Sequence, residues 1–129
     1  MIEDGSALKV FFRLFLQDRM EPVLPDHVTS GKVQLEVWRT PEKRRAVGME
    51  MGHVALVNVW LIGLNVPRVL PAGVEMVKKR WKGQGWTDDA GKGANSHLSG
   101  YDAFRTHPVS RLAVTRIEDA RMLMEALLP

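Results

Sequence analysis

The fold is decided by residues 32–64, which read KVQLEVWRTPEKRRAVGMEMGHVALVNVWLIGL. Positions 32–38 alternate between apolar and polar side chains, as a strand with one buried face does. Positions 45–51 alternate again after a short turn. Positions 54–64 are apolar on both faces, which predicts a central strand covered on both sides. The stretch therefore predicts a three-stranded antiparallel meander, with His53 in a structural role at the second turn.

The segment before this meander allows two interpretations. Residues 6–17 place apolar side chains on most of a helical wheel, but they also fit the alternation of a strand. Phe11 and Phe15 interrupt the alternation, so a helix is favoured. Residues 18–31 contain two prolines and a glycine and are expected to form a loop.

The segment after the meander predicts a further strand between helices. Pro71 fits a helix start, and residues 72–82 carry an apolar stripe at helical spacing. Residues 83–100 are rich in glycine and predict a long loop. Residues 111–117 predict a strand, and a final helix follows from Glu118, where an acid suits the positive end of the helix dipole.

These elements predict a single α+β domain over residues 1–129, with residues 1–5 and parts of 83–102 flexible. An antiparallel sheet of about four strands, the meander plus one, packs against two or three helices in this prediction. The helices cover one face of the sheet. The other face is open to solvent, lines a pocket or forms a dimer interface.

The cysteine content, the longest apolar run and the net charge exclude some classes of function. The chain has no cysteine, which excludes thiol catalysis, thiolate metal ligands and disulfides and fits a cytoplasmic location. The longest apolar run is too short to cross a bilayer, so no membrane association is expected. A net charge of +3 and a pI of about 9.5 are compatible with an anionic partner without requiring one. No motif indicates a cofactor or a metal site.

Basic and aromatic residues gather in two places, and they favour a small non-catalytic module that binds nucleic acid or another polyanion. Lysine and arginine neutralise phosphates, and tryptophan stacks on unpaired bases. The alternative for both clusters is an ordinary solvated surface. The candidate binding residues are Arg44, Arg45, Lys78, Lys79, Arg80, Lys82 and Trp86.

Two other functions stay open. In one, the 83–102 loop closes a small-molecule pocket in a binding protein or enzyme, with His97, Tyr101 and Asp102 as polar contacts. In the other, the phenylalanine-rich N-terminal segment packs on a second copy of the chain, giving a homodimeric interaction subunit.

Overall fold

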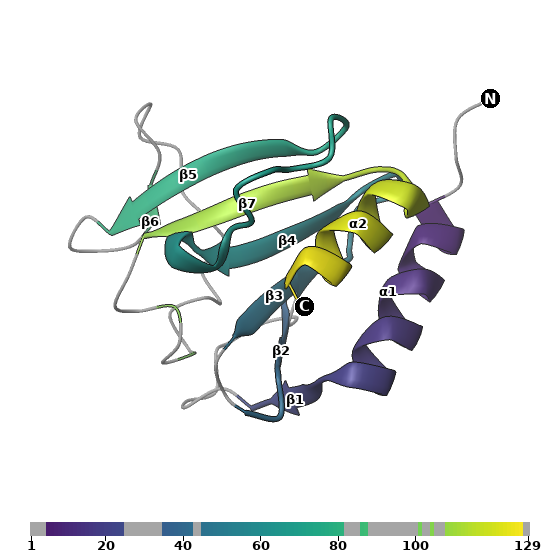
Figure 1. Ribbon diagram of the computed structural model, residues 1–129, viewed down its shortest axis with the longest axis horizontal. Helices are drawn as coiled ribbons and strands as arrows, with labels where there is room; N and C mark the ends of the chain where they lie inside the picture. The colour runs from purple at the N-terminus through teal and green to yellow at the C-terminus, as the bar shows by residue number, and fades with distance from the viewer. Residues whose placement is uncertain are drawn as a thin grey trace.

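A computed structural model describes residues 5–24, 35–42, 45–81, 86–87, 101, 104 and 108–127. Within these ranges two helices and an antiparallel sheet form an α+β fold, as the sequence predicts (Figure 1). The elements in chain order are α1 Gly5–Arg19, β1 Glu21–Val23, β2 Glu36–Arg39, β3 Ala46–Glu50, β4 Val57–Ile62, the short 3-10 helix η1 Gly63–Asn65, β5 Glu75–Trp81, β6 Trp86–Thr87, β7 Val109–Val114 and α2 Ile117–Leu127. None of the described helices is both long and apolar enough to cross a membrane.

The strands run in the spatial order β1-β2-β3-β4-β7-β5-β6, and each neighbouring pair is antiparallel. The predicted meander is confirmed as β2-β3-β4, and β4 is central as expected. The sheet is larger than the four strands predicted, with six main strands and the two-residue β6 at one edge. The strand β7 lies between β4 and β5, so the connection from β4 to β5 crosses it.

The prediction of a third helix over residues 72–82 is wrong. Residues Glu75–Trp81 form β5, which pairs with β7 from Glu75 opposite Ala113 to Lys79 opposite Val109. The apolar stripe at helical spacing is real, but β7 offers a row of backbone donors and acceptors that only a strand can satisfy. Tertiary pairing therefore overrides the local pattern.

Two smaller differences concern the loops. The segment predicted as a loop over 18–31 contains the last two residues of α1 and the short strand β1, which extends the meander by pairing with β2. Two residues of the 83–100 loop form β6 against the end of β5. The N-terminal segment is a helix, so the helical interpretation of 6–17 is confirmed.

The main core lies between the two helices and one face of the sheet, which we call the helix face (Figure 1). The helix α1 buries Leu8, Phe12 and Leu16, which repeat every four residues and so share one side of the helix. The helix α2 adds buried side chains at a similar spacing. The sheet contributes Val47, Met49, Val57, Val59, Leu61, Leu112 and Val114.

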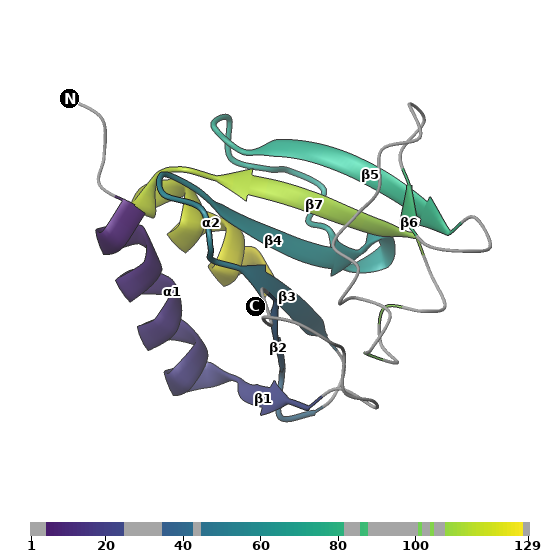
Figure 2. The ribbon, with the colours of Figure 1, turned by 180° about the vertical axis from the view of Figure 1, so that it is seen from behind.

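A second, smaller apolar cluster lies on the opposite face of the sheet, which we call the second face. Figure 2 views the molecule from this side, with α2 behind the strands and α1 beside them. Tyr101, Phe104 and Trp60 of β4 are its aromatic members. The remaining members of the cluster are Leu35, Val37 and Val109.

Candidate functional site

The basic stretch around residue 78 lies on a strand, which divides its side chains between the two faces of the sheet. Lys78 is exposed on the helix face. Lys79 points the other way and is only 2% exposed. The sequence places these two lysines in one binding surface, whereas the strand leaves Lys78 at the surface and Lys79 inside.

Arg45, just before β3, is partly buried and makes a specific contact. Its Nη1 donates a hydrogen bond to the backbone carbonyl of Leu127, at the end of α2. The last carbonyls of a helix have no partner within the helix and carry a partial negative charge, so a guanidinium there is stabilising. Arg45 therefore joins the sheet to the C-terminal helix.

The other candidate residues are described in part or not at all. Arg80 and Trp86 lie on β5 and β6, and the structure gives their backbone positions. The residues outside the described ranges are Arg44, Lys82, His97 and Asp102.

The strand registers bring the two basic segments to the same end of the sheet. Arg39 of β2 lies opposite Ala46, the residue after Arg45. On the far side of β4, Ile62 lies opposite Val109, which in turn lies opposite Lys79. Gly48 of β3 lies opposite Trp60 of β4, so continuing this register by two residues sets Ala46 beside Ile62. Three strand spacings, roughly 14 Å in all, then separate the two basic segments.

The β5–β6 hairpin places two tryptophans opposite each other. Trp81 and Trp86 are Cα partners, next to the pair Arg80 and Thr87. Directly opposed residues of an antiparallel pair are close neighbours. Trp81 drew attention in the sequence only as part of a helical stripe, because the register that pairs it with Trp86 depends on the strand.

Tyr101, proposed as a pocket contact, is buried in the apolar cluster of the second face. Burial, and secondarily the nearby Glu36 carboxylate, raises the pKa of its phenol above the ordinary value of 10.0. Its ring therefore packs as part of a core. The structure gives no arrangement that joins it to His97 or Asp102, since those two lie outside the described residues.

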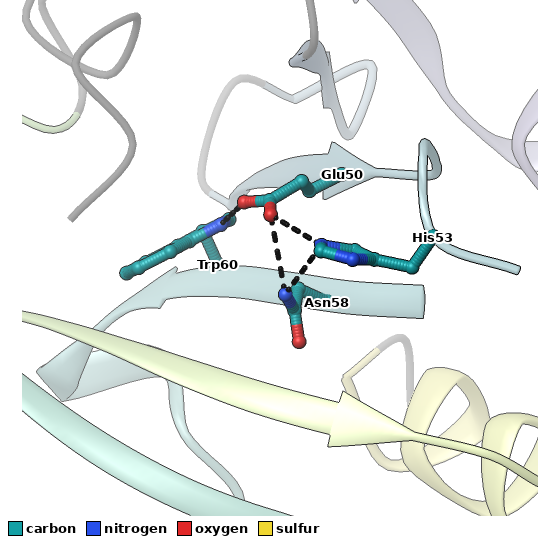
Figure 3. Close-up of polar contacts among 4 residues, drawn as sticks. All are labelled: Glu50, His53, Asn58 and Trp60. Atoms are coloured by element: carbon teal, nitrogen blue, oxygen red, sulfur yellow. Dashed lines mark hydrogen bonds and ion pairs between the residues drawn. The ribbon is translucent and has the colours of Figure 1, made fainter. Parts of the chain in front are cut away.

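A polar cluster at the other end of the second face was not found from the sequence. Figure 3 shows Glu50, His53, Asn58 and Trp60, with the carboxylate of Glu50 at the centre. Trp60 Nε1 donates to Glu50 Oε2 at 2.9 Å, and Asn58 Nδ2 donates to Oε1 at 3.2 Å. His53 Nε2 lies 2.8 Å from the same Oε1. Glu50 of β3 is thus held by two side chains of the neighbouring strand β4 and by one side chain of the bend that joins the two strands.

Burial explains why these contacts form. The side chain of Glu50 is 16% exposed, whereas that of His53 is 47% exposed. A carboxylate that is mostly removed from water needs donors to replace it, and the indole and amide groups supply them. The signal that locates this cluster is the pairing of Glu50 with Asn58, which depends on register.

A groove of about 470 Å³ opens on the helix face between the 63–66 segment, β5 and the start of β7. Its lining is mainly apolar, and Lys78 is its exposed basic residue. The lining residues are Gly63, Val66, Met76, Lys78, Lys79, Pro108, Val109 and Ser110. Among the residues with described positions, no three carboxylate or imidazole side chains gather closely enough to hold a metal ion.

Comparison of the chain with protein-family models, with curated proteins and with solved structures finds no match in any of the three.

Proposed function

We propose that this protein binds single-stranded nucleic acid, and that the β5–β6 hairpin is the centre of the binding surface. The observation that carries the proposal is the register of this hairpin, in which Trp81 lies opposite Trp86 at the end of a strand that also carries Lys78. The combination of aromatic residues with cations is what binding to single strands requires.

The tryptophans favour a single strand over a duplex. An indole ring stacks on the face of a base, and that face is available only when the base is unpaired. Stacking on indole rings has little sequence preference, because every base has a π face. The proposed partner is therefore a flexible single strand, and discrimination between base sequences is expected to be small.

The cations supply the attraction to phosphate. Lys78 is exposed on the helix face, whereas position 81 of the same strand belongs to the second face, so a bound single strand would have to pass around the edge of β5 to reach both the lysine and the tryptophans. The register puts Arg39 and Arg45 at the same end of the sheet. Arg45 already contacts the end of α2, and the Arg39 Nε lies 4.0 Å from the Glu21 carboxylate, so both are partly engaged within the protein. Lys78 is the described side chain on which the proposal depends most.

The test is the binding of a fluorescently labelled oligothymidylate, followed by fluorescence anisotropy at about 50 mM and about 200 mM salt. We expect affinity to fall as salt rises, because each neutralised phosphate releases counterions. Trp86→Ala should weaken binding by about five- to a hundredfold, the range for losing one stacked base. Lys78→Gln should lower the slope of log affinity against log salt by about 0.7.

The control is Arg121→Gln, which removes the same charge from an exposed position on α2. It should bind like the parent protein. Absence of binding at low salt would overturn the proposal. So would equal affinities for the Trp86→Ala variant and the control, because binding would then follow net charge alone.

A further inference from the structure

The groove beside β5 is built from segments far apart in the chain. The 63–66 segment forms one wall. The Gly63 N–H donates a hydrogen bond to the Pro108 carbonyl at 2.8 Å, and this bond holds the segment beside the start of β7. Met76 and Lys78 of β5 form the opposite wall. The groove lies on the helix face, because Met76 and Lys78 share a face with the buried core residue Leu112.

The groove is lined by both apolar and polar residues. Val66, Met76 and Pro108 provide apolar surface that a ligand would remove from water. Lys78 and Ser110, which are opposite each other in the register of β5 and β7, provide an ammonium group and a hydroxyl. The remaining polar residue of the lining is Lys79, which belongs to the opposite face of β5.

We propose that this groove binds a small ligand with an apolar body and a single carboxylate, such as a short fatty acid or an aromatic acid. The volume is within the range of small-molecule sites. The carboxylate would face the Lys78 ammonium and accept a hydrogen bond from the Ser110 hydroxyl, while the apolar body lies against Val66 and Met76. This site is distinct from the nucleic-acid surface and shares only Lys78 with it.

The test uses octanoate below its micelle concentration, with octylammonium and 1-octanol as probes of equal chain length. Titrations are followed by amide chemical shifts in nuclear magnetic resonance spectra. We expect octanoate to shift the amides of residues 63–66, 76–79 and 108–110, and to bind two- to fivefold more tightly than octylammonium, as an exposed charge pair allows. Shifts spread evenly over the protein, or equal affinity for both probes, would overturn the proposal.

Reversing the charge gives the sharpest result. Lys78→Glu should invert the preference, so that octylammonium binds more tightly than octanoate, while affinity for 1-octanol stays unchanged. The control Arg121→Glu makes the same change of charge on α2, outside the groove, and should keep the preference for octanoate. An unchanged preference in Lys78→Glu would contradict the site.

The two proposals can fail separately. Trp86→Ala removes a residue of the hairpin that is absent from the groove lining, so octanoate should bind this variant as it binds the parent protein. Val66→Trp fills the groove from the 63–66 segment. It should abolish octanoate binding and leave oligothymidylate binding intact, provided that circular dichroism shows an unchanged fold.

Discussion

The two faces of the sheet are stabilised by different kinds of contact, although the strand β4 contributes side chains to both. Val57, Val59 and Leu61 of β4 point to the helix face and are completely buried in an apolar core. The alternate residues point to the second face, where Asn58 and Trp60 hydrogen bond to a carboxylate. The helix face thus depends on packing, and the second face adds polar contacts of fixed geometry.

Trp38 and Trp60, the two tryptophans of the meander, also differ in their contacts on the two faces. Trp38 of β2 packs against the core of the helix face, and its Nε1 is buried without a hydrogen-bond partner among the described residues. Trp60 is buried on the second face, and its Nε1 donates to Glu50. Equivalent side chains therefore contribute in different ways, through ring packing alone in one case and through packing and a charged acceptor in the other.

The largest expected effect is on the helix face. Phe12→Ala removes a completely buried ring from the interface of α1 with the sheet. It should lower the free energy of unfolding by about 3–5 kcal/mol, measured by urea denaturation. Leu14→Ala, on the exposed side of the same helix, should change it by less than about 0.5 kcal/mol. Similar losses for the two variants would mean that α1 does not pack as described.

The contrast between the faces also explains which elements could be predicted from the sequence. The meander was predictable because alternation reports one buried face, and the double burial of β4 removes that alternation over 57–62. The segment 72–82 was mispredicted because Val74, Val77 and Trp81 also fit a helix. Only the neighbouring strand β7, which is more than 25 residues later, decides between the two.

For the candidate site, residue types were more predictable than their positions. The sequence identifies lysines and arginines that suit phosphate, but it does not show that Lys79 is buried or that Arg45 contacts the end of α2. The first fact follows from the pairing of β5 with β7, and the second from the position of α2 beside the sheet. The cluster around Glu50 could not be predicted from the sequence either, because the contact of Glu50 with Trp60 depends on the register of two neighbouring strands.

The second prediction compares the two tryptophans directly. Trp60→Phe keeps an aromatic ring but removes the donor to Glu50, so a mostly buried carboxylate loses a partner. Trp38→Phe makes the same change of volume and removes a donor that has no partner within the described ranges. We expect Trp60→Phe to cost about 1–3 kcal/mol more than Trp38→Phe in urea denaturation. Equal costs would show that the bond to Glu50 adds nothing to stability.

The smallest expected effect concerns Tyr101, which packs on the second face. It is the only tyrosine in the chain, so tyrosinate absorbance reports this residue alone. Burial first, and the Glu36 carboxylate second, raises the pKa of its phenol, so the midpoint in the folded protein should lie above 10.0. In strong urea the midpoint should return to about 10.

The sign of the accompanying stability change follows from this shift. The folded state holds the phenol proton more tightly than the unfolded state does, so the contribution to stability is complete below the unfolded pKa and is lost as the pH rises through the folded one. The urea midpoint should therefore fall once the pH exceeds 10.0, and it should fall less in Tyr101→Phe, which has no phenol to ionise. Identical pH profiles for the two proteins would place Tyr101 at the surface, and the apolar cluster of the second face would then be open to water.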